Sequence, residues 1–156
     1  MYSESSEPCG VFSDTSPISV YGESKLLAER DVFHYSSHYN ITVFVFRFFN
    51  IFGPNQFLYN PSAVIPSFLS AAAESKPIIV NNSAQAVRDF VPVSVVADSI
   101  VSAIFSNIFI NKPIPVCSGI PRSNLSVAET ITSFPEVSSE IIIKDNTDSS
   151  SLLYSL

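Results

Sequence analysis

One segment limits the possible folds more than any other. Residues 41–49 read ITVFVFRFF and are apolar except for Thr42 and Arg47. Most of the apolar side chains are β-branched or aromatic, and these residue types favour extended backbone. A strand that is apolar at almost every position has no side suited to solvent, which is typical of a strand buried on both faces in a parallel sheet. The sequence therefore predicts a long inner strand at residues 41–49.

Predicted helices alternate with short apolar strands along the rest of the chain. Apolar residues recur at helical spacing from Leu26 to Phe33, which predicts a helix over residues 20–38 that ends at Asn40. Further helices are expected at residues 63–74, at 95–106 with Ser94 as its cap, and at 126–134 with Ser126 as its cap; further strands are expected at 77–80, 90–93, 113–118 and 140–144. This order indicates the α/β class. Because a single inner strand cannot form a parallel sheet, the chain is expected to be the C-terminal part of a larger fold, with a frayed tail at 145–156.

Charge and glycine content exclude two kinds of site. The formal net charge is −6 and the 8 Lys and Arg residues form no cluster, so a nucleic-acid groove, which needs clustered cations, is not expected. The 4 glycines are Gly10, Gly22, Gly53 and Gly119. They are too far apart to form a Gly-rich nucleotide phosphate loop. If a nucleotide cofactor is used, its phosphates must be held by other residues.

No segment is suited to a membrane or to export. The first residues, MYSESSEPCGVF, have neither the basic nor the apolar region of a signal peptide. The longest apolar run, residues 41–52, contains Arg47 and is too short to cross a hydrocarbon layer of roughly 30 Å. We therefore expect a cytoplasmic protein with no membrane partner.

Tyr21 and Lys25 are the first candidate pair for chemistry. They are four positions apart in the predicted helix, so their side chains share one face. A nearby cation favours a phenolate over a phenol, and such a pair is therefore a compact proton-transfer device. The same spacing is also common on ordinary exposed helix faces, so the structural interpretation stays open at this point.

His34 and His38 have a spacing that is compatible with zinc binding. A zinc protease helix of this kind would need Glu at the position that is occupied here by Tyr35. The sequence suggests no third ligand. We therefore expect two exposed helix histidines and no metal site.

The surroundings of Tyr21 form part of a longer series of motifs. The segments are SVYGESKLLAE at residues 19–29, RFFNIFGPNQ at 47–56, AVIPSF at 63–68, RDFV at 88–91, and Cys117-Ser118-Gly119 followed by Ser126. In this order they closely resemble the active-site helix and the subsequent segments of the extended short-chain dehydrogenase/reductases. The branch they resemble most contains the nucleotide-sugar epimerases and dehydratases and is UDP-glucose 4-epimerase-like. The resemblance covers residues 1–135.

The resemblance implies a Rossmann-type fold, NAD as the cofactor with NADP not excluded, and a nucleotide sugar as the substrate. Residues 1–61 would be the end of the NAD-binding domain, with the Tyr-x-x-x-Lys helix and an inner strand. Residues 62–144 would be mostly the small α/β substrate-binding domain. Members of this family often dimerise through the helix that corresponds to residues 20–38, so a homodimer through the Tyr21 helix is a further implication.

The resemblance also implies roles for individual residues near the cofactor. Tyr21 would be the catalytic acid/base at the sugar hydroxyl. Lys25 would hydrogen-bond the nicotinamide ribose and favour the tyrosinate. Phe49 would offer a backbone contact to the nicotinamide end of the cofactor.

Three residues would contact the nucleotide sugar. Asn50 and Arg88 would bind its diphosphate, and a guanidinium suits this task because its fork matches phosphate oxygens. Gln56 would lie near the nucleotide. The structural alternatives are a strand-ending loop cap for Asn50 and a local ion pair with Asp89 for Arg88.

The sequence departs from the family pattern in three ways. These residues contain no Gly-rich phosphate loop and lack the catalytic Ser/Thr that the family places before the tyrosine. The family's R-D-[FY]-V-x-V-D-D-V-A segment reads RDFVPVSVVA here, without its later acids. Pro92 stands in the predicted strand, where it removes a ladder donor. We therefore expect an N-terminally truncated form that is catalytically inactive as an isolated chain.

The preferred hypothesis is an NAD-dependent nucleotide-sugar epimerase/dehydratase that oxidises C4 of the sugar. Three alternatives stay open: an enzyme whose N-terminal half is a separate chain, a non-catalytic sugar-nucleotide-binding remnant or interaction module, and a nucleotide-sugar reductase. In the enzyme interpretations Tyr21 and Lys25 are the central residues, whereas a binding role would not depend on the Tyr21 hydroxyl.

Overall fold

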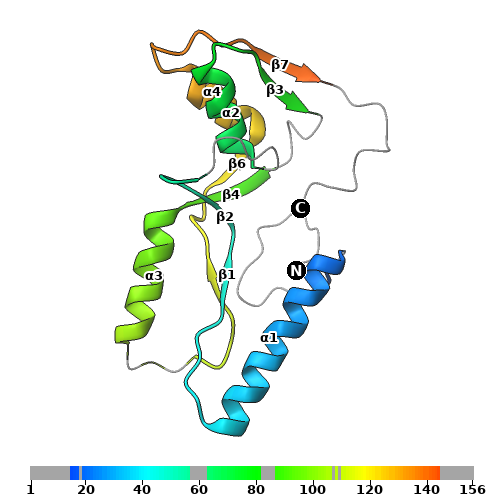
Figure 1. Ribbon diagram of the computed structural model, residues 1–156, viewed down its shortest axis with the longest axis vertical. Coiled ribbons are helices and arrows are strands. Elements are labelled where there is room, and N and C mark those ends of the chain that lie inside the picture. The colour runs from blue at the N-terminus through cyan, green and yellow to red at the C-terminus, as the bar shows by residue number, and fades with distance from the viewer. Residues whose placement is uncertain are drawn as a thin grey trace. The chain divides into compact units, whose positions relative to one another are not determined.

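A computed structural model describes residues 15–17, 19–56, 63–81, 87–106, 108 and 110–144 (Figure 1). The chain divides into two compact units, Met1–Phe48 with Val95–Val116, and Phe49–Ser94 with Cys117–Leu156. The predicted frayed tail lies outside the described residues. The predicted domain boundary at residue 61 stays a prediction.

The first unit begins with helix α1, Val20–Tyr39. Ser19 caps its N-terminus, since its hydroxyl accepts the Gly22 N–H at 3.1 Å. Asn40 ends the helix in the left-handed conformation with φ 52° and donates its N–H to the Ser36 carbonyl, as is common at helix C-termini. The predicted helix and its end at Asn40 are therefore confirmed.

Strand β1, Phe46–Phe48, pairs in parallel with β5, Ile114–Val116. In Figure 1, α1 and α3, Val93–Phe105, lie on opposite sides of this pair. α3 directly follows a strand at Val93, so the predicted cap at Ser94 is wrong. Ser94 instead lies in the first turn of the helix.

The long strand predicted at residues 41–49 is also wrong in extent. The structure has strand geometry at β1 and, after Phe49, at β2, Asn50–Phe52, while Ile41 is 56% exposed. A strand extends only as far as its partner can pair with it. Here β5 contains Pro115 and follows Pro113, and proline has no N–H to donate to a ladder.

The second unit contains a three-stranded sheet in the order β2-β4-β6. β4, Val87–Pro92, runs parallel to β2 and antiparallel to β6, Pro121–Ser123. Pro92 ends β4 opposite Phe52, a strand end where a missing N–H costs little. The sequence did not predict β6, because its residues have no apolar alternation.

The core of the second unit lies between two helices and a strand pair. β3, Ile78–Asn81, pairs in parallel with β7, Ile141–Lys144. Helices α2, Val64–Ala73, and α4, Asn124–Thr132, pack against each other and against β3. The buried residues of this core are Phe68, Ile78, Val80, Ala128 and Ile131. Burial of these side chains stabilises the unit by roughly 1.5–3 kcal/mol for each larger residue.

Helix α4 starts earlier than the sequence predicts. The hydroxyl of Ser123 accepts the Ser126 N–H at 3.0 Å, so Ser123 is the cap. Ser126 lies inside the helix and donates its hydroxyl to the Ser123 carbonyl. Two serines three positions apart are equally good caps by sequence. The end of β6 at Ser123 decides between them.

Together, the parallel strand pairs and the helices between them confirm the α/β class. No helix in the described ranges is long and apolar enough to cross a membrane.

Candidate active site

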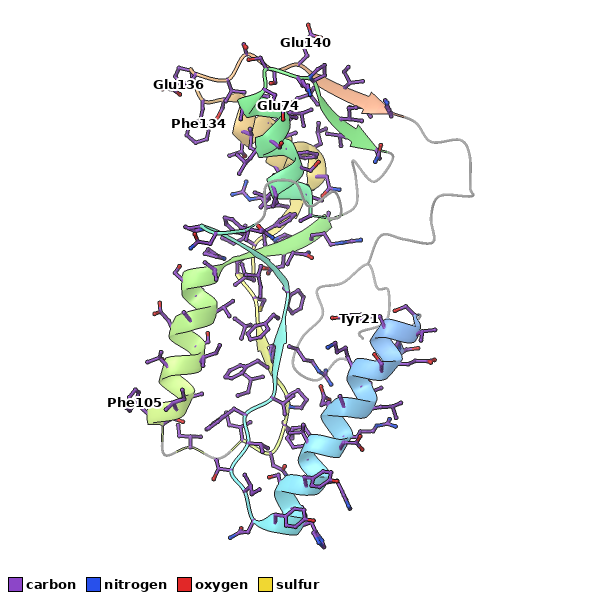
Figure 2. All side chains as sticks on the ribbon, in the orientation of Figure 1. Tyr21, Glu74, Phe105, Phe134, Glu136 and Glu140 are labelled. Carbon is purple, nitrogen blue, oxygen red and sulfur yellow. The ribbon has the colours of Figure 1, made fainter. Side chains whose placement is uncertain are left out.

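Tyr21 and Lys25 lie next to each other on the first turns of α1. The Lys25 ammonium nitrogen is 5.3 Å from the centroid of the Tyr21 ring, within the range of a cation–π contact. Both side chains are exposed, and Figure 2 shows Tyr21 projecting from the N-terminal end of the helix. A phenol and an ammonium are therefore held together and open to a ligand, as proton transfer requires.

Glu29 anchors this helix to the strand pair of the same unit. Its carboxylate accepts two hydrogen bonds from the Arg47 guanidinium, at 2.9 Å from Nε and 2.7 Å from Nη2. The two side chains are only 9% and 11% exposed, so this is a nearly buried, bidentate ion pair. It ties α1 to β1 at Glu29, on the helix that also carries Tyr21 and Lys25.

In the second unit, Asn50 and Arg88 lie on one sheet. Asn50 in β2 is opposite Phe90 in β4, and Arg88 is two positions before Phe90 on the same strand. Residues two apart on a strand share a face, and so do directly opposite residues. Asn50 and Arg88 therefore present their side chains on the same face of the sheet, and both are exposed.

The predicted alternative for Arg88, an ion pair with Asp89, is not what the structure shows. The carboxylate of Asp89 accepts the N–H groups of Ser118 and Gly119 at 2.8 and 2.7 Å. The Arg88 guanidinium donates to the carbonyl of Val87 at 3.1 Å. Because neighbouring strand residues face opposite sides, Asp89 holds the loop after β5 while Arg88 remains on the other face.

Gln56 and Gly53 shape the loop after β2. The side-chain amide of Gln56 donates a hydrogen bond to the Ile51 carbonyl at 3.2 Å. This bond ties the loop back to β2, the strand that precedes it. Gly53 has φ +151°, and a Cβ at this position would lie 2.5 Å from the Val93 side chain. Phe49, half-buried, joins the end of β1 to the start of β2.

Sequence reasoning missed two residues that lie beside the predicted site residues. One is Glu29, the partner of Arg47. A charge such as Arg47 inside an apolar segment indicates a buried partner, but the sequence does not say which residue that partner is. The other is Arg122, which lies directly opposite Arg88 on β6. Its position depends on strand register, and no local sequence signal indicates it.

The two histidines behave as expected of an exposed helix surface. The rings of His34 and His38 are stacked with centroids 6.3 Å apart, and both residues are exposed. Within the described ranges, no group of 3 or more His, Cys, Asp or Glu side chains could hold a metal ion.

Comparison with known proteins identifies this architecture. The solved structure of UDP-glucuronic acid 4-epimerase from Bacillus cereus, in complex with UDP-glucuronic acid and NAD, superposes with a TM-score of 0.79 at 22% identity, covering 92% of this chain and 45% of that chain. UDP-N-acetylglucosamine 4-epimerase from Methanobrevibacter ruminantium gives a TM-score of 0.80 at 22% identity, covering 94% and 48%. The fold is thus that of the Rossmann-type nucleotide-sugar epimerases.

The family follows from the sequence itself. The profile of the NAD dependent epimerase/dehydratase family matches residues 1–110, so the chain belongs to this family, and the predicted resemblance is confirmed. It is 34% identical over 89 residues to dTDP-L-rhamnose 4-epimerase of Burkholderia thailandensis, covering 56% of this chain and 24% of that protein. It is 28% identical over 94 residues to the uncharacterized UDP-glucose epimerase YtcB of Bacillus subtilis, covering 60% and 29%. The chain spans less than half of the length of these relatives.

Proposed function

We propose that this chain provides the proton-transfer and sugar-nucleotide-binding residues of an NAD-dependent nucleotide-sugar epimerase/dehydratase. The observation that carries the proposal is the contact between the Lys25 ammonium and the Tyr21 ring on an exposed face of α1, in a member of this family. Asn50 and Arg88, on one sheet face, are the proposed ligands of the substrate diphosphate.

The proposed chemistry of the chain's own residues is proton transfer at the sugar. Tyr21, as the phenolate, accepts the proton of the C4 hydroxyl and later returns it. The Lys25 ammonium lies 5.3 Å from the centroid of this ring. Arg88 holds the diphosphate through charge-assisted hydrogen bonds. The ion pair of Glu29 with Arg47 joins α1, which carries Tyr21, to β1.

The described residues fit one end of the cofactor. The Lys25 ammonium is exposed and carries donors that suit ribose hydroxyls, and the backbone of Phe49 is the proposed contact for the nicotinamide end. When bound, NAD supplies the hydride acceptor for C4 oxidation. The 156 residues contain only 4 glycines, all far apart, and so form no Gly-rich loop. The pyrophosphate of NAD must therefore be bound in another way.

The substitution Tyr21→Phe tests the function. In the enzyme, alone or together with the polypeptide that supplies the Gly-rich loop, we expect epimerase or dehydratase turnover to fall at least about a hundredfold, because the proton acceptor is lost. Binding of the sugar nucleotide should persist, because the ring remains. Turnover is followed by NMR of the sugar products. The matched control is Tyr35→Phe, a second exposed tyrosine of α1, which should leave turnover unchanged.

The same experiment separates the alternatives. Turnover that survives Tyr21→Phe contradicts the proposed mechanism. Sugar-nucleotide binding without turnover in any reconstituted form supports the binding module instead. A net reduced sugar product, formed with consumption of reduced cofactor, supports the reductase.

The cytoplasmic localisation remains a proposal that rests on the resemblance to this family.

A further inference from the structure

Two of the chain's few cations face each other across a strand pair. Arg88 in β4 is directly opposite Arg122 in β6 in the antiparallel register, and both are exposed. The whole chain has only 8 Lys and Arg residues against 14 acids. Like charges directly opposite each other destabilise a strand pair. An anion bound by both guanidinium groups would relieve this repulsion.

The surrounding residues do not neutralise this pair. In the described part of the chain, the Arg88 guanidinium donates a hydrogen bond to the backbone carbonyl of Val87, and no carboxylate forms an ion pair with either arginine. The nearest acid in sequence, Asp89, points its carboxylate to the N–H groups of Ser118 and Gly119.

A pocket begins at Arg122. Its volume is about 410 Å³, and its lining includes Arg122, Phe90, Ser118 and Thr130 with apolar residues of α4. Phe90 lies on the same strand face as Arg88, two positions away. Arg122 thus lies at the edge of a mostly apolar pocket, and Arg88 is directly opposite it on the neighbouring strand.

We infer that Arg122 is a second anion-binding residue and forms, with Arg88, a clamp for a diphosphate. Each guanidinium takes one phosphate group of the phosphoanhydride through paired N–H donors. The inference rests on the proposed function in naming a sugar nucleotide as the ligand, and it adds a preference: a diphosphate engages both arginines, whereas a monophosphate engages one.

The test uses the full chain, with inorganic pyrophosphate as the probe and thermal unfolding and calorimetry as the measurements. We expect Arg122→Gln to weaken pyrophosphate binding at least about tenfold, because a charged hydrogen-bonding partner is lost. Without the anion, the same substitution should leave the unfolding temperature unchanged or raise it, since it removes a like-charge pair. Arg122→Lys should retain part of the binding, and Arg30→Gln, an exposed arginine on α1, should have no effect on it.

Two results would overturn the inference. One is pyrophosphate binding by Arg122→Gln that equals that of the unsubstituted chain. The other is a lower unfolding temperature of Arg122→Gln without the anion, which would make the arginine structural. A parallel titration with UDP-glucose keeps the two proposals distinct. If Arg122→Gln binds UDP-glucose as tightly as the unsubstituted chain, the clamp is contradicted. If pyrophosphate binding depends on Arg122 but UDP-glucose does not bind, the clamp is supported and the proposed function is contradicted.

Discussion

At the residue scale, a nearly buried ion pair connects the helix that carries Tyr21 to a strand. Arg47 is a charge within an apolar segment, and it is stabilised there by a bidentate contact with Glu29 at 2.7 and 2.9 Å. The two residues are 18 positions apart, so the contact joins α1 to β1 rather than stabilising either element alone. Such a nearly buried pair is costly to break, because the remaining charge keeps its desolvation penalty.

The first residue-scale prediction concerns this pair. Glu29→Ala should lower the free energy of unfolding by about 3 kcal/mol, since it leaves Arg47 without its carboxylate partner. Chemical denaturation measures the change. Replacing both residues by methionine should recover most of the loss, because two apolar side chains leave no unpaired charge. Glu23→Ala, at an exposed position of the same helix, is the control. If Glu29→Ala and Glu23→Ala lowered the free energy of unfolding equally, the ion pair with Arg47 would not be what stabilises this contact.

The second residue-scale prediction concerns Gly53. Gly53→Ala should destabilise the protein by roughly 2–4 kcal/mol, because an added Cβ meets the Val93 side chain at 2.5 Å and φ is unfavourable for alanine. Gly119→Ala is a matched control: its φ is +73°, but nothing lies within 4 Å of the added Cβ, so only backbone strain of about 1–2 kcal/mol is expected. Equal losses in thermal denaturation would contradict a steric role for Val93.

Elements show which surfaces are left for other molecules. Within α1, the buried residues are Gly22 and Glu29. A row of apolar side chains at helical spacing instead remains open: Val32, Tyr35 and Tyr39 are 40%, 59% and 58% exposed. The rings of Tyr35 and Tyr39 stack with centroids 5.6 Å apart. An ordered apolar row of this kind suits helix–helix packing.

The element-scale prediction is a dimer through this row of α1. If the proposed homodimer forms, Val32→Glu should convert it to a monomer, because a carboxylate cannot be buried in an apolar helix interface without a partner. Light scattering reports the mass of each form. Arg30→Glu, another exposed position of α1, should leave the mass unchanged. A monomeric unsubstituted protein at high concentration would contradict the proposal directly.

At the scale of the whole molecule, the residues with proposed roles are distributed over both units. Tyr21 and Lys25 belong to the first unit, and Asn50, Gln56 and Arg88 to the second. The family profile matches residues 1–110 and so includes residues of both. The chain therefore carries both the proposed proton-transfer pair and the proposed diphosphate ligands.

The whole-molecule prediction concerns cofactor affinity. Residues 1–156 by themselves should show no binding of NAD in the micromolar range by calorimetry, because no Gly-rich loop among them can approach the pyrophosphate. Adding a polypeptide with a Gly-rich βαβ unit that completes the enzyme should restore binding. A micromolar dissociation constant for residues 1–156 alone would show that these residues hold the cofactor by another route.

Local spacing was sufficient for several features of this protein. The helix that carries Tyr21 and Lys25, its end at Asn40 and the family motifs are all read within short windows, because helical periodicity and capping depend on near neighbours. The α/β class followed from the order of such windows. These features were correct because few long-range interactions compete with them.

Tertiary structure decided the rest. The partner of Arg47, the start of α4 at Ser123 and the juxtaposition of Arg88 with Arg122 all depend on which distant segments pair and in which register. The length of a strand likewise depends on its partner, which is why only Phe46–Phe48 of the apolar segment 41–49 forms a strand, and the next strand begins beyond it at Asn50. Residue type gives the capacity to pair, but only the folded backbone selects the partner.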